Sequence, residues 1–269
     1  VERLKALQHR DASSSSAQTM STEEEEEQSS LLRRLEVESW DVSPTADREV
    51  NVLDADQLMR AFDAFEPSTV IHAAGVVKFR RVDAETLREV NVKGTTNVLS
   101  RCKNGKTRHL VYLSTVAVLG ARTNLEDDGP LLTEEDFRCG RTFERNPYAQ
   151  SKQDAHELVL AFRKENPNVC VTILLPGFLT GPNPNSTYWE KKTIPSCVPF
   201  GTVSLVDVRD VAKAIAMIVR TNARNVDGSP HITNADYVVT GYNLSCRDFA
   251  EKLHEIYTGG MQKKSIRNV

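Results

Sequence analysis

The first 74 residues of the chain contain no glycine, and the first one is Gly75. A loop that holds a diphosphate against a helix N-terminus needs glycines, because only they let the backbone approach so closely. No segment before Gly75 can supply such a loop. Long apolar runs are also lacking. None approaches the ~18 residues that a membrane span requires, no secretory signal is present, and membrane association is not visible in the sequence.

Basic residues are not in surplus, because the formal net charge is −3. Without a basic face we expect no nucleic-acid partner. The five cysteines are scattered and form no C-x-x-C pair; they are Cys102, Cys139, Cys170, Cys197 and Cys246. This pattern predicts reduced thiols in an intracellular protein rather than a disulfide or zinc framework, and no spacing of His, Cys and Asp suggests a metal.

The beginning of the chain differs in character from the rest. Residues 1–47 look irregular, with serines at Ser13–Ser16 and an acidic run at Glu23–Glu27. That run is typical of a solvated loop, and an acidic docking motif is the alternative. Order is predicted to begin near residue 48. Because the chain starts with Val1 rather than methionine, we interpret it as a fragment or an irregular gene model.

From residue 48 onwards, short apolar runs alternate with amphipathic segments. The runs predicted as strands are Val50–Leu53, Thr69–Gly75, Leu110–Thr115, Val169–Leu175 and Tyr237–Thr240. The segments predicted as helices are Ala55–Phe65, Asp83–Arg101, Tyr148–Lys164, Val206–Thr221 and Ser245–Tyr257. This alternation indicates an α/β fold with a parallel sheet covered on both faces. Functional residues of such sheets gather at the carboxyl ends of the strands.

One pair of residues, Tyr148 and Lys152, points to proton transfer. Four residues apart on a helix, they share one face. A phenol titrates near pH ~10, and a nearby ammonium favours the phenolate. We therefore predict that Lys152 lowers the pKa of Tyr148 and fits it for acid–base work. The spacing alone is common; its weight comes from Thr115 and Asn91 upstream.

These motifs follow one another as they do in the extended short-chain dehydrogenase/reductase family, which the chain resembles from about residue 48 to 258. The segments that carry the resemblance are His72–Gly75, Asn91–Thr95, Ser114–Gly120, Tyr148–Lys152, Pro176–Pro182 and Val206–Ala212. The resemblance implies a Rossmann-like, doubly wound parallel sheet with a small C-terminal substrate-binding region. Its substrate-binding elements are expected mainly in residues 183–205 and 225–269.

Within this family the chain is most similar to the 3β-hydroxysteroid and sterol-4-carboxylate 3-dehydrogenase branch. Asn91–Thr95, Tyr148–Leu160 and His231–Asn234 carry this similarity. Dihydroflavonol-reductase-like and fatty-acyl-reductase-like proteins share much of the pattern. The branch implies an apolar alcohol or ketone as substrate and a role in steroid biosynthesis and lipid metabolism. The residues expected to line its pocket are Tyr188, Trp189 and Phe200.

The resemblance also implies catalytic roles. Tyr148 would move the hydroxyl proton, and Lys152 would tune it and hold the nicotinamide ribose. Thr115, chosen over Ser114 by counting back from the glycine that closes the motif, would hydrogen-bond the substrate oxygen. Asn91 would join the proton relay.

The implied cofactor is NAD or NADP. The residues expected to contact it are Ala73, Ala74, Gly75, Lys152, Pro176, Gly177 and Asp54. Gly75 and Gly177 would let the backbone approach the cofactor closely. Asp54 could equally cap the following helix. His72 is expected to be a packed strand residue rather than a ligand.

The family's glycine-rich fingerprint is missing from its expected place. We interpret this as a first strand and loop that lie upstream of Val1. A sheet without its first strand should expose an edge. We therefore predict that this chain alone is unstable or binds the cofactor poorly.

We expect an NAD(P)-dependent oxidoreductase that acts on a CH–OH group, with a 3β-hydroxysteroid or sterol-like alcohol as substrate. Two alternatives stay open. One is a non-catalytic remnant or binding protein without a working dinucleotide site. The other is a nucleotide-sugar epimerase or dehydratase, which uses the same residues with a retained cofactor. A homodimer and a cytoplasmic or endoplasmic-reticulum location are compatible with either enzyme.

Overall fold

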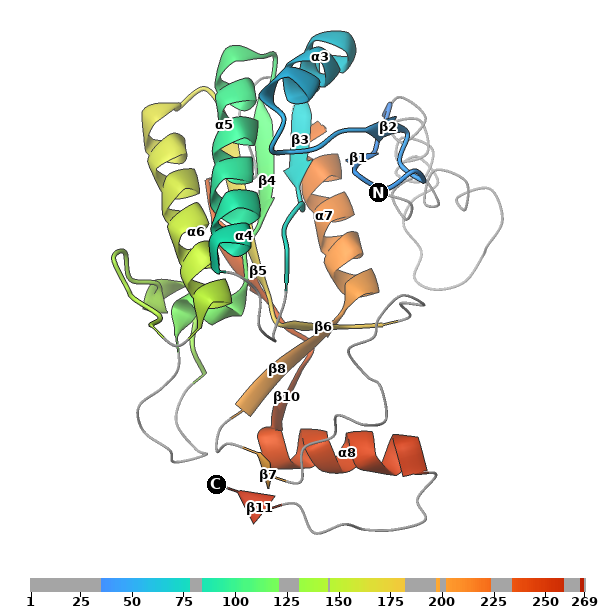
Figure 1. Cartoon of the computed structure of the whole chain (residues 1–269), viewed down its shortest axis with the longest axis vertical. Coiled ribbons are helices and arrows are strands. Elements are labelled where there is room, and N and C mark those ends of the chain that lie inside the picture. The colour runs from blue at the N-terminus through green and yellow to red at the C-terminus, as the bar shows by residue number, and fades with distance from the viewer. Residues whose placement is uncertain are drawn as a thin grey trace, which may run out of the picture.

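A four-stranded parallel sheet forms the centre of the protein (Figure 1). The computed structural model describes residues 35–77, 84–120, 131–144, 146–181, 197–198, 202–223, 234–258 and 267–268. In spatial order the strands are β3 (Thr69–His72), β4 (His109–Leu113), β5 (Cys170–Pro176) and β9 (Asp236–Val239). All three pairings are parallel, and β4 and β5 are buried on both faces, which explains their continuous apolar runs.

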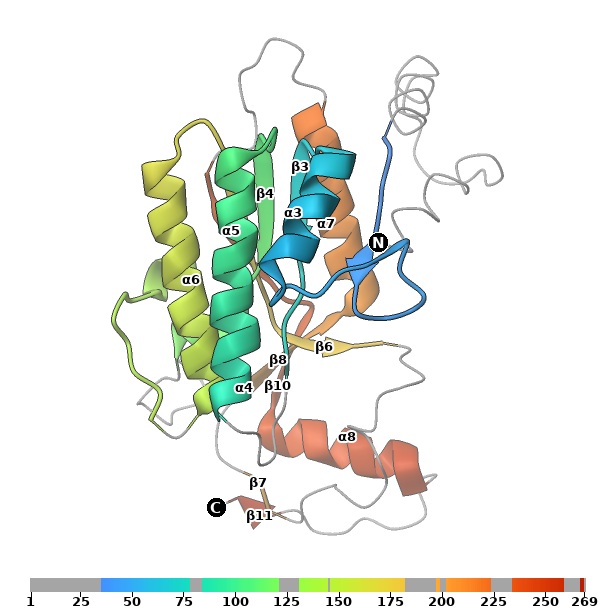
Figure 2. The same ribbon diagram turned by 45° about the horizontal axis from the view of Figure 1, so that its top comes forward.

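Helices cover both faces of this sheet, as expected for a Rossmann-like fold (Figures 1 and 2). One face carries α3 (Ala55–Phe65), α5 (Gly94–Asn104) and α6 (Pro147–Glu165), and the other carries α7 (Val208–Ala223). Leu110 and Tyr112 of β4 belong to the first core, whereas Val111 belongs to the core under α7. Side chains alternate along a strand, so each strand contributes to both cores.

A second, smaller sheet lies beyond the carboxyl ends of β5 and β9 (Figure 1). Its strand order is β10 (Tyr242–Ser245), β8 (Thr202–Asp207) and β6 (Phe178–Thr180). The helix α8 (Cys246–Thr258) packs beside it, and β7 (Cys197–Val198) pairs with β11 (Arg267–Asn268). Much of the expected substrate-binding region, including Tyr188, Trp189 and Phe200, lies outside the described residues.

The described chain begins within the stretch expected to be irregular. Two short parallel strands, β1 (Trp40–Asp41) and β2 (Arg48–Glu49), lie there, and the Trp40 ring packs edge-on against Phe62 of α3 at 5.2 Å. The strand predicted at Val50–Leu53 is wrong, because β2 ends before it. An Asn51-centred turn takes its place, since the Asn51 side chain accepts the backbone N–H of Leu53.

The helix predicted at Asp83–Arg101 is present but interrupted. It begins as α4 (Ala84–Arg88), passes through a π-helical turn, η1 (Glu89–Lys93), and continues as α5. The first residue of α5 is Gly94, and a Cβ there would lie 2.8 Å from Val52 Cγ2. Such π-turns insert one residue into a helix and occur mostly at functional sites, and this one carries Asn91.

The other predicted elements of the main sheet and its helices are confirmed to within a few residues. Two short 3-10 helices, η2 (Val116–Leu119) and η3 (Glu134–Asp136), complete the region around the end of β4. Across the described part of the chain, no helix is both long and apolar enough to cross a bilayer.

Candidate active site

Helix α6 presents three polar side chains, Tyr148, Lys152 and His156, toward the end of β4. They are spaced four residues apart and therefore share one face of the helix. The helix starts just before them, with Pro147 at its first position and the Asn146 side chain accepting the backbone N–H of Ala149. This N-terminus fixes where along β4 each of the three side chains lies.

Tyr148 meets Thr115, the residue predicted to hold the substrate oxygen. Thr115 is half-buried, caps η2 by accepting the backbone N–H of Ala117, and hydrogen-bonds the Tyr148 phenol. Burial raises the pKa of Tyr148, and the bond from Thr115 offsets this only in part. The predicted lowering of this pKa by Lys152 is therefore not seen.

The amine of Lys152 is buried beneath the tyrosine. Its Nζ donates to the Leu113 carbonyl oxygen at 2.7 Å and to the Tyr112 hydroxyl at 3.1 Å, and it lies 4.6 Å from the Tyr112 ring centroid. Burial lowers the pKa of Lys152 to about 7. The side chain is thus held at the end of β4 by two acceptors, and one of its three N–H donors is left for another partner.

The structure separates the two neighbouring hydroxyls that the sequence left adjacent. Ser114 is buried, and its hydroxyl pairs with His156 Nδ1 at 2.8 Å, while Thr115 faces Tyr148. His156 lies two turns along α6 from Tyr148, so the Ser114 hydroxyl is engaged away from the tyrosine. This arrangement supports the choice of Thr115 over Ser114.

Asn91 ties the loop after β3 to α6. Its amide accepts the backbone N–H of Val76 at 2.8 Å and donates to the Val76 carbonyl at 3.2 Å and the Ser151 hydroxyl at 2.9 Å. Both amide hydrogens are thereby used. These contacts make Asn91 a cross-link between two parts of the site, and its role in a proton relay stays a prediction.

The exit from β3 exposes the backbone that was predicted to run along the cofactor. Ala73, Ala74 and Gly75 are all exposed at the carboxyl end of the strand. A Cβ at Gly75 would lie 3.2 Å from Asn91 Oδ1, so the missing side chain makes room for the Asn91 amide. Contact of these three residues with a cofactor stays a prediction.

Pro176 and Gly177 have a different environment from the one expected. Both are buried, and a Cβ on Gly177 would lie 2.6 Å from the Ser204 carbonyl oxygen. The absence of a side chain is therefore needed to let β8 cross close to the end of β5. Contact of Pro176 and Gly177 with a cofactor stays a prediction.

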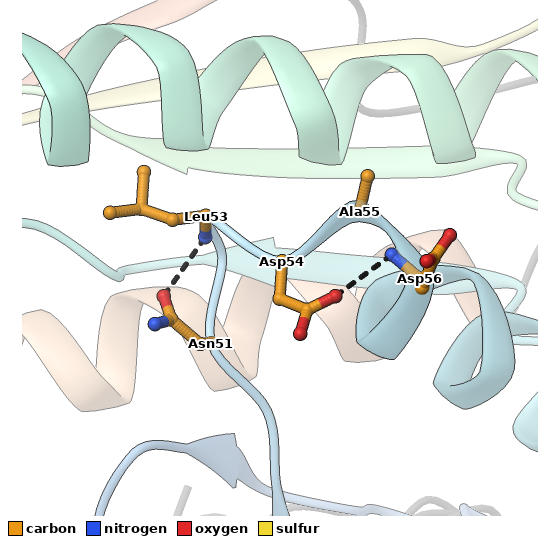
Figure 3. A pocket seen from close by; sticks show the side chains of 5 residues that line it. All are labelled: Asn51, Leu53, Asp54, Ala55 and Asp56. Atoms are coloured by element: carbon orange, nitrogen blue, oxygen red, sulfur yellow. Dashed lines mark hydrogen bonds between the residues drawn. The ribbon is translucent and has the colours of Figure 1, made fainter.

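Asp54 caps α3, the second of the two roles the sequence allowed. Its carboxylate accepts the backbone N–H groups of Asp56 at 3.0 Å and Gln57 at 2.9 Å. Together with its neighbours it lines an open pocket at the start of α3 (Figure 3), formed by Asn51, Leu53, Asp54, Ala55 and Asp56. Sequence reasoning missed Asn51; the turn residue before a helix N-cap was the available signal.

Histidines near the site are packed groups. His72 Nε2 lies 2.9 Å from the Thr95 hydroxyl, and burial together with the charge of Lys152 lowers the pKa of His72 to about 3. Within the described residues, no group of three His, Cys, Asp or Glu side chains is arranged to hold a metal ion.

The fold and the site together define a class: Rossmann-like α/β proteins with a tyrosine and a lysine one turn apart on a helix at the carboxyl end of the sheet. The profile of the NAD dependent epimerase/dehydratase family matches residues 21–235, more than half of the chain. The chain belongs to this family, whose cofactor is NAD. This membership confirms the resemblance to extended short-chain dehydrogenases/reductases.

Curated relatives cover parts of the chain. Human 3 beta-hydroxysteroid dehydrogenase type 7 is 40% identical over 92 residues, which are 34% of this chain and 24% of that protein. The dTDP-D-glucose 4,6-dehydratase of Dictyostelium discoideum is 25% identical over 228 residues, 77% of this chain and 49% of that protein. The chain thus matches half or less of the length of these relatives.

A solved structure with the same fold is the Thermus thermophilus UDP-glucose 4-epimerase in complex with NAD. It superposes with a TM-score of 0.64 at 21% identity, covering 89% of this chain and 79% of that one. The dTDP-glucose 4,6-dehydratase DesIV of Streptomyces venezuelae, with NAD bound, gives 0.63 at 21% identity over 82% and 66%. At this identity the likeness concerns the fold.

The described residues fit one end of a dinucleotide better than its middle. Lys152 keeps one donor, and Ala73 to Gly75 expose backbone at the same edge of the sheet. Residues 35–74 contain no glycine, so the described chain has no glycine loop at which a pyrophosphate could approach a helix N-terminus. The nicotinamide end is therefore the part that these residues would hold.

Proposed function

We propose that the chain carries the catalytic end of an NAD(P)-dependent oxidoreductase that acts on a CH–OH group, with a 3β-hydroxysteroid or sterol-like alcohol as substrate. The observation that carries this is that α6 places Tyr148 beside Thr115 and Lys152 on the Leu113 carbonyl at the end of β4. These three groups suffice to orient a hydroxyl and accept its proton.

Tyr148 would take the carbinol proton at its phenolic oxygen, and Thr115 would hold the carbinol oxygen in place by a hydrogen bond. Since burial raises the pKa of Tyr148, its conversion to phenolate requires positive charge nearby. Lys152 is the nearest described cation on the same helix face. The nicotinamide ring supplies the hydride acceptor. Lys152 would hold the attached ribose through its remaining donor.

The substrate class rests on likeness within one segment. The 92 residues that match the human hydroxysteroid dehydrogenase do so at 40% identity, well above the 21% of the sugar-nucleotide enzymes in the structural comparison. An aromatic contact between Phe178 and Phe249, with ring centroids 6.2 Å apart, lies in the smaller sheet and its helix beyond the end of β5. An apolar wall there suits a steroid skeleton.

The second candidate, a nucleotide-sugar epimerase or dehydratase, is favoured by coverage. The Dictyostelium dehydratase aligns over 77% of the chain, more than twice the share covered by the hydroxysteroid enzyme. Such enzymes return the hydride to the product, so turnover requires no net reduction of added cofactor. Cofactor stoichiometry therefore separates the two candidates.

The test is absorbance of reduced nicotinamide when the chain is mixed with NAD or NADP and a 3β-hydroxysteroid, with UDP-glucose and dTDP-glucose in parallel. We expect steroid-dependent reduction that Tyr148→Phe lowers by about 10²- to 10⁴-fold, the usual contribution of a positioned acid–base group. Tyr237→Phe, on an exposed tyrosine of β9, is the matched control and should leave the rate unchanged.

Two results would overturn the proposal. Equal loss in Tyr148→Phe and Tyr237→Phe would remove Tyr148 from the chemistry. Conversion of a nucleotide sugar without steroid oxidation or net cofactor reduction would establish the second candidate instead.

A further inference from the structure

A chain of buried polar side chains runs from Lys152 away from the site, through three further residues that no catalytic role uses. It comprises Lys152 of α6, Tyr112 of β4, Thr95 of α5 and His72 of β3, each at most 7% exposed. Four different elements of the sheet and its helices thus meet in one line of polar groups. Such groups are costly to bury unless each finds a partner.

Counting donors and acceptors fixes the direction of this line. The single proton of the Thr95 hydroxyl goes to the Asn91 carbonyl at 2.6 Å, so Thr95 can only accept from its other neighbours. His72 is neutral, because burial and Lys152 lower its pKa to about 3, and its Nε2 therefore carries the N–H that points at Thr95. Thr95 also lies beside the Tyr112 phenol.

The Tyr112 phenol is then a neutral acceptor for Lys152. Burial and the neighbouring Tyr148 raise the pKa of Tyr112 well above its ordinary value, so it keeps its proton at every working pH. The neutral phenol oxygen accepts Lys152 Nζ at 3.1 Å. Among the described residues, Tyr112 is the side chain that accepts a hydrogen bond from Lys152, and the second acceptor is the backbone carbonyl of Leu113.

We propose that Tyr112 is a positioning residue for Lys152: its hydroxyl accepts one N–H of the ammonium and fixes the nitrogen at the carboxyl end of β4. A lysine side chain is otherwise a flexible four-carbon chain that loses considerable rotamer entropy when fixed. The catalytic consequence rests on the function proposed above. The positioning itself does not, and it is measured without any substrate or cofactor.

The test is a pH titration of Lys152 in the Tyr112→Phe variant. NMR monitors the titration on the full chain, in which the lysines carry ¹⁵N and ¹³Cε labels. The signal is assigned by its loss in Lys152→Met. An acceptor stabilises the ammonium and not the amine, so its removal should lower the pKa of Lys152 by about one unit below that of the wild type. The charge of Lys152 acts on His72 and His156, and Tyr148 lies near Tyr112; all three residues are unchanged in this variant.

Thr172→Val is the matched control. Thr172 is fully buried on the neighbouring strand β5, and its hydroxyl pairs with His109 Nε2 at 3.0 Å, without contact to Lys152. It removes one buried hydroxyl bond, as Tyr112→Phe does, and should leave the Lys152 titration in place. A Lys152 titration that is identical in wild type, Tyr112→Phe and Thr172→Val would overturn the proposal.

If Tyr112→Phe does not fold, Thr95→Val carries the test. It keeps both acceptors of Lys152 but replaces the hydroxyl that lies beside the Tyr112 phenol, so the Lys152 signal should broaden or shift, and an unchanged signal would refute the proposal. A chain that shows the Lys152 shift but oxidises no alcohol would refute the proposed function and leave the positioning role intact.

Discussion

The two halves of the candidate site are built in different ways. The catalytic half, where α6 meets the end of β4, consists of buried side chains that hold one another, such as Lys152 on Tyr112 and Ser114 on His156. The nucleotide half comprises the loop after β3 and the start of α3, and it is exposed. The side chains of Asn51 and Asp54 there accept backbone N–H groups from residues two and three positions further along the chain.

The two halves differ in how far their geometry is fixed before a ligand binds. In the catalytic half, hydrogen bonds between elements distant in sequence fix the geometry in advance, which is what catalysis requires. In the nucleotide half, binding would rest on close backbone approach, and residues 35–74 hold no glycine to allow it. We therefore expect sound catalytic geometry combined with weak cofactor binding by this chain.

The largest effect should come from Asn91→Ala, which removes the cross-link between the two halves. Three hydrogen bonds are lost and the Val76 amide and carbonyl lose their partner, so the free energy of unfolding should fall by about 3 kcal/mol. Urea denaturation measures it. Asn97→Ala, which removes one bond from the same helix to the Val52 carbonyl, is the control at about 1 kcal/mol. Equal losses in both variants would mean that the halves are not coupled through Asn91.

A smaller effect is expected from acid. Burial and the charges of Lys152 and Arg163 lower the pKa of His156 to about 4, and the Glu157 carboxylate opposes this lowering. The unfolded chain binds this proton near pH ~6.5, so His156 contributes stability that is present above that pH and lost as pH falls toward 4.

At pH 5 this loss is about 2 kcal/mol for one such histidine. His156→Gln should therefore reduce the drop in unfolding free energy between pH 7 and pH 5 by that amount, as measured by urea denaturation at both values. His109, whose pKa burial also lowers to about 4 at the opposite end of β4, serves as comparison in His109→Gln. A wild-type stability that does not change between pH 7 and 5 would contradict both expectations.

The smallest effect concerns the nucleotide half. Asp54→Ala removes the cap of α3 and should cost about 1 kcal/mol of unfolding free energy, whereas Asp54→Asn keeps an oxygen for the cap and should cost less. Calorimetric titration with NAD provides the second measurement. If Asp54 acts only as a cap, Asp54→Asn leaves cofactor affinity unchanged; a marked loss of affinity would restore its predicted contact with the cofactor.

Much of the fold could be predicted from the sequence because it follows from local pattern. The bounds of α3 agree with the predicted helix at Ala55–Phe65, and the apolar runs of β4 and β5 follow from burial on both faces. The strand predicted at Val50–Leu53 failed because a short apolar run resembles a strand even when an asparagine turns the chain.

The candidate site was predictable as a set of residues but not as a set of contacts. Spacing placed Tyr148 and Lys152 on one helix face, and the structure keeps them there. It did not indicate that the Lys152 amine turns to Tyr112, because that phenol comes from a strand 40 residues earlier in the chain. The sequence also did not indicate that Gly177 makes room for β8, because the position of a glycine does not show which part of the chain packs against it.

The sequence by itself determined the alternation of strands and helices, the family, and which residue types stand at the ends of the strands, because these depend on periodicity and on neighbours in the chain. Only the tertiary structure decided which hydroxyl faces Tyr148, what holds Lys152, and that Asn91 joins the two halves of the site. Each of these is a contact between elements brought together by packing, and the direction of a side chain at such a contact is set by the partner that satisfies its hydrogen bonds.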